Sequence, residues 1–222
     1  MSTDFTVVLG APARPMADLV TAIETSVIGR GGLRHDGTLL RCSMQAGTGT
    51  YDETSPERAT GPATHLSDLA SDVAAWDGFA CEMWNETVQL YIMVGRVKRA
   101  EGDYVNAWVT ISSRGLSRLA NEDNLPAYYA ALGEIGEAIG ATAGYGHFEV
   151  AYEPLPPERA ERAIVDLPDY PGEPATVGVV PMSRWSLVEL QRVHGRIFDI
   201  VGTTAGYWVL TNKQLSAWLG TT

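Results

Sequence analysis

The chain has 222 residues, a net charge of −11 at neutral pH and a sequence pI near 4.7. Hydrophobic residues make up 45% of it and charged residues 19%, which suits a globular protein and excludes wholesale disorder. The acidic excess disfavours nucleic acid as a partner, and no apolar run approaches the roughly 18 residues that span a bilayer.

The N-terminus also lacks the basic start and apolar stretch of a secretory signal. We therefore expect a soluble cytoplasmic protein that binds neither nucleic acid nor membranes. Cys42 and Cys81 lie in apolar, strand-like runs and are predicted to be buried free thiols, with a disulfide as the alternative if a signal has been removed.

In chain order, the first half of the sequence predicts strand, helix and strand. Residues 5–9 form a short apolar run, and a helix is expected from Pro15, a residue that suits the first helical turn. A second strand is expected at 39–44. Residues 45–64 are polar and rich in Gly, Thr and Pro, which predicts a long loop of a kind that is often functional. The apolar face of the first helix would carry Met16, Leu19, Val20, Ile23 and Val27.

The middle of the chain gives the clearest pattern. Ser67 is expected to cap a short helix that stops at residues 77–78. Strands at 79–84, 87–97 and 104–112 then follow one another through connections short enough for hairpins.

A helix over 125–139 comes next, because its apolar residues recur at steps of three and four. Gly133 and Gly136 within this helix indicate close packing against a sheet. Residues 147–152 predict a further strand.

The last part of the chain begins with a proline-rich crossing at 154–174. Beyond it the sequence predicts a strand at 176–180, a helix opened by a capping box of Ser186 and Glu189, a hairpin pairing 196–201 with 206–211, and a terminal helix capped by Asn212.

These elements predict an α+β fold, with a mostly antiparallel sheet and helices packed mainly on one face. Residues 1–222 would form a single unit, or two lobes at 1–153 and 175–222 that share the sheet across the 154–174 crossing. The second lobe is too short to be trusted with an independent core.

No catalytic or metal-binding motif is present, so neither a metal nor a cofactor is predicted. The four histidines, His35, His65, His147 and His194, fall in no metal-binding spacing. His194 is expected in the last turn of its helix, where a cation suits the helix dipole.

His147 and Glu149 alternate on the strand predicted at 147–152 and would share one face. Such a pair can act as acid and base, although it is more often a surface or hydrogen-bonded pair. The alternative function is therefore a small-ligand-binding protein or a hydrolase-like enzyme. Its pocket would lie near His147 and Glu149, with Tyr51 as a further polar group.

Acidic residues are concentrated between positions 52 and 86, where eight of them stand against one basic residue. Either they form a solvated face that keeps the protein soluble, or they steer a basic partner toward the surface.

The strands at 87–97 and 104–112 each predict one apolar face and one mixed face. The mixed face carries Tyr, Trp and Met among neutral polar residues, a composition typical of recognition surfaces. The alternative is that a helix or the C-terminal lobe covers it. The mixed face comprises Gln89, Tyr91, Met93, Tyr104, Asn106, Trp108 and Thr110, with Glu82 and Trp84 on the matching side of the preceding strand.

The segments YVNAWVTISS, LPAYYAALGEIGEAIGATAGYG and RIFDIVGTTAGYWVLT, with the proline-rich crossing between the last two, resemble in layout the immunity proteins of bacterial polymorphic toxin systems. The resemblance implies a small cytosolic protein that binds and blocks a cognate toxin, and it carries over no individual residue.

We therefore expect a non-catalytic inhibitor whose partner is a protein, such as a basic toxin domain. A structural or adaptor subunit is a third hypothesis. The acidic stretch and the mixed face together give the predicted partner-binding residues: Asp52, Glu53, Asp68, Asp72, Glu82, Trp84, Tyr91, Tyr104 and Trp108.

Overall fold

The computed structural model describes residues 4–44, 51–52, 63–148, 156, 158, 177–215 and 219. Its strands are β1 (Asp4–Pro12), β2 (Leu40–Met44), β3 (Tyr51–Asp52), β4 (Gly78–Trp84), β5 (Gln89–Val97), β6 (Tyr104–Ser112), β7 (Ala143–Phe148), β8 (Val177–Pro181), β9 (Phe198–Gly202) and β10 (Tyr207–Asn212). Its helical segments are α1 (Met16–Ile23), the π-helix η1 (Glu24–Arg30), the 3₁₀-helix η2 (Leu66–Leu69), α2 (Ala70–Val73), α3 (Ser113–Asn121), α4 (Leu125–Ile139) and α6 (Leu187–His194).

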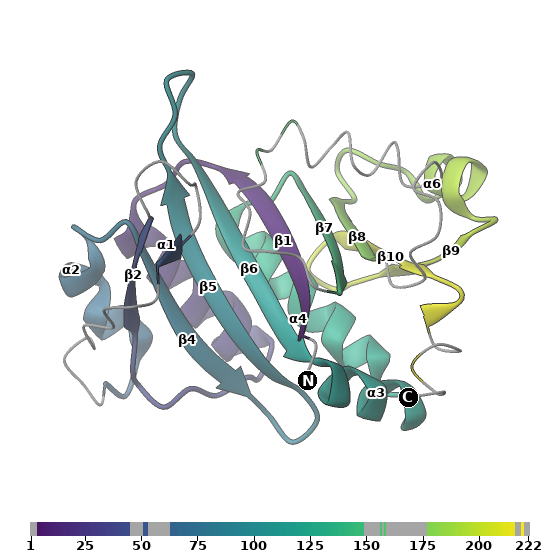
Figure 1. Cartoon of the computed structure of the whole chain (residues 1–222), viewed down its shortest axis with the longest axis horizontal. Coiled ribbons are helices and arrows are strands. Elements are labelled where there is room, and N and C mark those ends of the chain that lie inside the picture. Colours follow the sequence, from purple (N-terminus) through teal and green to yellow (C-terminus); the bar gives the residue numbers. More distant parts are fainter. Residues whose placement is uncertain are drawn as a thin grey trace.

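The strands form one sheet in the order β3-β2-β4-β5-β6-β1-β7-β8-β10-β9 (Figure 1). Every neighbouring pair in that order is antiparallel. The pairing of β7 with β8 joins strands from both sides of the proline-rich crossing into the same sheet. The α+β prediction is confirmed, whereas the division into one or two folding units stays a prediction.

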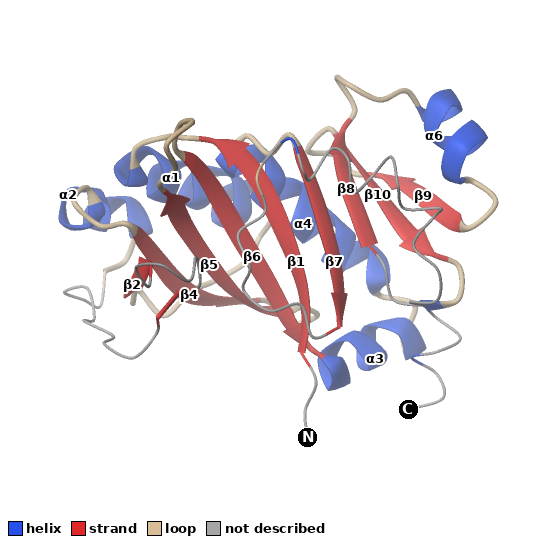
Figure 2. Cartoon of the chain, turned by 45° about the horizontal axis from the view of Figure 1, so that its top comes forward, coloured by secondary structure: helices blue, strands red, loops and turns tan. Residues whose placement is uncertain are grey.

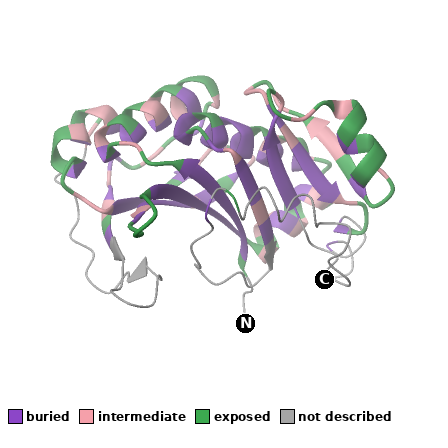
Figure 3. Ribbon diagram, turned by 90° about the horizontal axis from the view of Figure 1, so that it is seen from above, coloured by how far each residue is buried: buried purple, intermediate pink, exposed green. Residues whose placement is uncertain are grey.

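Helices α1 and α4 cover one face of the sheet, and the main core lies between them and the strands (Figures 2 and 3). Alternation along β5 and β6 directs the predicted apolar faces into this core, because side chains two residues apart lie on the same side of a strand. The confirmed core residues of these strands are Leu90, Ile92, Val94, Val105, Ala107, Val109 and Ile111, with Val88 just before β5.

Helix α4 has the predicted bounds, and its glycines lie against the β9–β10 hairpin, Gly133 against its turn and Gly136 against β10. A Cβ on Gly133 would stand 2.4 Å from the Thr203 hydroxyl oxygen, and one on Gly136 would stand 3.3 Å from the Tyr207 ring. The Tyr207 hydroxyl also hydrogen-bonds the carbonyl oxygens of Gly136 (3.0 Å) and Ala141 (2.9 Å). Glycine at positions 133 and 136 therefore permits the approach of helix to sheet.

Helix α6 is the exception to the one-sided arrangement. It begins with the predicted capping box, in which Ser186 and Glu189 each accept the other's backbone N–H. Only Leu190 and His194 of this helix are buried, and they pack on the opposite side of the sheet from α4. There Leu190 joins a small apolar cluster of Ala143, Val180, Phe198 and Leu210.

Several sequence predictions are corrected. Helix α3 was not predicted, since its polar sequence buries only Leu116 and Leu119. Ser67 lies inside η2 and does not cap it, because η2 already begins at Leu66. The expected loop at 45–64 includes the short strand β3, which pairs with β2.

Strand β7 begins four residues before the predicted strand at 147–152. It pairs with β1 from Ala143 to Phe148, which places Gly144 opposite Leu9 and Gly146 opposite Val7. Because the core-side positions of β7 are glycines, the strand shows no apolar alternation in the sequence.

Both cysteines are buried free thiols, as predicted. Burial raises the pKa of Cys81 to about 12, so this thiol is not a reactive one.

Candidate functional site

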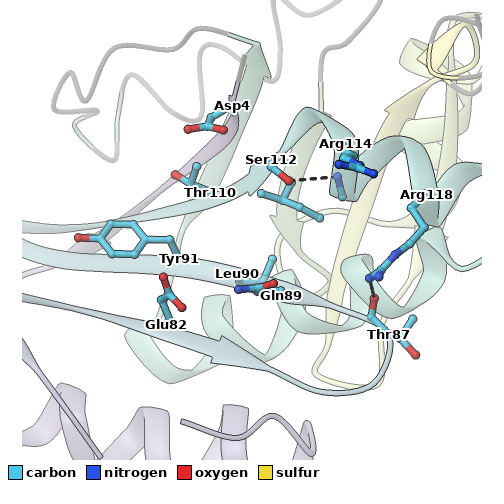
Figure 4. Close-up of a pocket in the computed structure, with 12 residues that line it drawn as sticks. Asp4, Glu82, Thr87, Gln89, Leu90, Tyr91, Thr110, Ser112, Arg114 and Arg118 are labelled. Atoms are coloured by element: carbon cyan, nitrogen blue, oxygen red, sulfur yellow. Dashed lines mark hydrogen bonds between the residues drawn. The ribbon is translucent and has the colours of Figure 1, made fainter. Parts of the chain in front are cut away.

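A hollow of about 620 Å³ opens on the sheet face opposite α1 and α4, next to the first turn of α3 (Figure 4). We call it the β-face hollow. Its volume is in the range of sites that hold small ligands. The residues that define it are Asp4, Glu82, Thr87, Gln89, Leu90, Tyr91, Thr110, Ile111, Ser112, Arg114, Gly115 and Arg118.

A row of side chains crosses four strands at the hollow, and three of its members, Glu82, Tyr91 and Thr110, line it. In the sheet register Glu82 is paired with Tyr91, Tyr91 with Thr110, and Thr110 with Thr6. The hydroxyls of Thr6 and Thr110 are buried and hydrogen-bonded to each other at 3.0 Å. The row is therefore polar along its length and is held in place by the sheet.

Asp4 adds a second carboxylate to the hollow, on the strand three positions away from that of Glu82. Neighbouring strands are about 4.8 Å apart, so β4 and β1 are separated by roughly 14 Å. At that separation the two carboxylates do not share a proton, and they are too far apart for the paired-carboxylate arrangement of glycosidases.

Two arginines stand at the other side of the hollow, on α3. The Ser112 hydroxyl caps this helix by accepting from the Gly115 N–H (3.1 Å). Arg114 and Arg118 are exposed and one turn apart, and the Arg118 guanidinium donates to the Thr87 carbonyl oxygen (2.8 Å).

Figure 4 shows these arginines on the side away from Glu82 and Tyr91. The hollow therefore carries Glu82 and Tyr91 at one end and the two arginines at the other, with Asp4 paired across the sheet with Ser112 at the start of α3. Such an arrangement orients a ligand or partner whose charges match it.

Two of the predicted partner-binding residues line the hollow, namely the exposed Glu82 and the half-buried Tyr91. Trp84 is half-buried at the end of β4, where its backbone pairs with Arg34.

The prediction that Tyr104 and Trp108 contact a partner is corrected. Trp108 is fully buried and Tyr104 is 5% exposed. They pack on the mixed face with Val8, Cys42, Ala80, Met93 and Val97 in a second apolar cluster. Much of the mixed face is thus packing surface, but every described member of this cluster comes from the strands β1, β2, β4, β5 and β6. Whether a helix or the C-terminal lobe covers the face stays a prediction.

The acidic residues of the 52–86 stretch do not gather on one surface. Asp68 and Asp72 are exposed on η2 and α2, which pack with α1 in the helical layer, whereas Glu82 lies on the opposite sheet face. Asp52 is placed on β3 without a described side chain, and Glu53 lies outside the described residues. Steering by this stretch stays a prediction.

The predicted acid–base pair is not tested by the structure. His147 is paired with Thr6 in the sheet, but its side chain, that of Tyr51 and all of Glu149 lie outside the described part.

A histidine–carboxylate cluster missed by the sequence does occur at Glu24, at the start of η1. Its carboxylate accepts from the Leu66 N–H (2.7 Å) and lies 3.1 Å from His65 Nδ1 and 4.0 Å from His35 Nε2. These residues are far apart in the chain, so no local spacing could have found them. The carboxylate ties residues 65–66 to η1.

Within the described ranges there is no group of three or more His, Cys, Asp or Glu side chains able to hold a metal ion. Nor does any described helix have the length and apolar content needed to cross a bilayer.

No protein-family model and no curated protein matches this sequence. Among solved structures, the fold is similar to that of a T6SS protein of Pseudomonas aeruginosa, with a TM-score of 0.46 and 11% sequence identity. The alignment covers 95% of this chain and 65% of that one, so this chain spans less than two thirds of its length. At this similarity the comparison assigns no function.

Proposed function

We propose that the protein is a non-catalytic, cytoplasmic protein-binding protein of the immunity type, which inhibits a basic bacterial toxin domain by occluding it. The observation that carries the proposal is the β-face hollow, where Glu82 and Tyr91 are accessible side by side on a rigid sheet.

The chemistry of this surface suits a protein partner. Tyr91 offers a large, rigid contact area at low cost in conformational entropy. Glu82 and Asp4 supply negative charge, and the net charge of −11 adds a long-range attraction toward a basic surface. The sheet fixes the backbone of these residues before binding, so association has to order only their side chains.

The proposal is tested by affinity purification of the tagged protein from its native cells at low and moderate salt, with mass spectrometry of the co-eluting proteins. We expect one stoichiometric partner whose retention falls with salt, and we expect that partner to be toxic when expressed alone. Recovery of background proteins only would contradict the proposal.

Glu82→Lys should weaken binding to that partner at least about tenfold, because it places a like charge against a basic surface. The matched control is Glu101→Lys, at an exposed position in the β5–β6 hairpin turn. Equal affinities of the two variants, measured by calorimetry, would exclude the hollow from the interface.

Reversing the charges of both Asp68 and Asp72 should slow association with the basic partner and leave folding unchanged, since both residues are exposed. The association rate at low salt is the measurement. A rate equal to that of the unmodified protein would show that the acidic stretch only solvates the surface.

The hollow also favours a second candidate, a small-ligand-binding protein, because its volume and convergent polar groups are those of a ligand site. This candidate predicts that ligand binding survives in the purified protein without any partner. The hydrolase-like alternative at His147 and Glu149 also stays a proposal, and mutagenesis of those two residues would test it.

A further inference from the structure

Arg114 and Arg118 are two exposed cations, four residues apart on α3, in a protein with a net charge of −11. Arg30 has carboxylate partners in Glu134 and Glu137, and Lys98 has one in Asp77, whereas the described contacts of Arg14, Arg96 and Lys213 are with backbone carbonyl oxygens. Among the described residues no ion pair involves Arg114 or Arg118, and the Arg118 guanidinium bonds only a neutral backbone carbonyl.

The two arginines also disfavour one another. Like charges four residues apart on a helix repel, at a cost of a few tenths of a kcal/mol. Arg114 is the second residue of α3, where the positive end of the helix dipole disfavours a cation. Neither of these electrostatic effects stabilises the fold, and the stabilising contact described for the pair is the hydrogen bond from Arg118 to the Thr87 carbonyl oxygen.

Both side chains instead line the β-face hollow, which is open and large enough to admit a ligand. We propose that the hollow binds an oxyanion, a carboxylate or phosphate group of its ligand, between Arg114 and Arg118. An anion there removes the repulsion between the two guanidinium groups and gains charge-assisted hydrogen bonds from both. Gln89 and Thr87 also line the hollow and offer neutral donors. The exposed Asp4 carboxylate, paired with Ser112 across the sheet, disfavours an anion on its own side, so the site is confined to the side of the two guanidinium groups.

The opposite end of the hollow limits what the rest of the ligand can be. Glu82 repels a second negative charge, so a ligand that reaches it is neutral or cationic there. This inference goes beyond the proposed function and needs no protein partner, so the two fail independently.

The test is an NMR titration of the full-length ¹⁵N-labelled protein with inorganic phosphate and, separately, with acetate, at an ionic strength held constant with sodium chloride. We expect saturable shifts of the Nε–Hε signals of Arg114 and Arg118 and of the Gly115 amide. Arg114→Gln should weaken the affinity about tenfold, the usual effect of losing one charge-assisted hydrogen bond. Tighter binding of phosphate or of acetate identifies which oxyanion the site prefers.

The matched control is Arg192→Gln, at an exposed arginine of α6 on a different part of the sheet. It should leave the affinity unchanged. Arg118→Gln provides a second variant at the site, and the amide spectrum of each variant reports whether it is folded. Shifts at Arg192 as large as those at Arg114, or an affinity unchanged in both site variants, would overturn the proposal.

Discussion

Replacing Trp108 by alanine is expected to lower the free energy of unfolding by about 3–5 kcal/mol, the usual cost of removing a buried tryptophan. The side chain is fully buried in the middle of β6, among apolar side chains contributed by β1, β2, β4 and β5. Its removal leaves a cavity that a hydrogen-bonded sheet cannot collapse to fill. Urea denaturation followed by far-UV circular dichroism measures the loss.

The control for this substitution is Tyr91→Ala, since Tyr91 lies on the same sheet face but is only half-buried. Its effect should be clearly smaller, and it should reduce partner binding without unfolding the protein. If Trp108→Ala lowered the free energy of unfolding no more than Tyr91→Ala does, the mixed face would be open to solvent. That result would support the hypothesis that the whole mixed face is a recognition surface.

The alternation of residues in β5 and β6 predicted correctly which side chains share a face, because the two-residue period is a property of the strand itself. It could not predict how much of the second face is covered. Trp108 and Tyr91 are both aromatic and both lie on the mixed face. The structure nevertheless buries Trp108 fully and leaves Tyr91 half-buried. That difference depends on contacts between distant parts of the chain.

The β-face hollow shows the same limit. Glu82 and Tyr91 were selected from sequence, but their pairing with Thr110 and Thr6 requires the register of four strands. The sequence does not point to Arg114 and Arg118, because α3 buries too few apolar residues to give a helical pattern. By contrast α4 was predicted with correct bounds, since its apolar face is repeated over four turns.

His194 is a buried histidine whose replacement is expected to change the stability of the protein by a large amount. Sequence position predicted a cation at the end of α6, but the ring is buried, and neither of its nitrogens has a hydrogen-bond partner among the residues that the structure describes. Burial lowers the pKa of His194, so the folded protein holds it neutral. Arg192 and Arg196, the charged residues two positions away on either side, are exposed, and Lys213 donates to the Gly195 carbonyl oxygen (2.6 Å).

Substituting leucine for His194 should raise the free energy of unfolding at pH 7.5 by about 1–3 kcal/mol, because it replaces an unpaired buried polar group with an apolar one. Gln191→Leu, an exposed position on the same helix, is the matched control and should change stability little. Equal stabilities of the two variants would mean that the His194 nitrogens do have partners.

The same residue makes the protein sensitive to acid. Because the pKa of His194 is lower in the folded than in the unfolded chain, the unfolded state binds the proton first as the pH falls. The stability associated with neutral His194 is present above the unfolded pKa of about 6.5 and is lost as the pH falls from there toward the folded pKa. Denaturation curves at pH 7.5, 6.0 and 5.0 should therefore show a steeper loss in the unmodified protein than in His194→Leu. Parallel losses would assign the acid sensitivity to other groups, whereas a steeper loss shows that α6 is held to the sheet by a histidine that must stay uncharged.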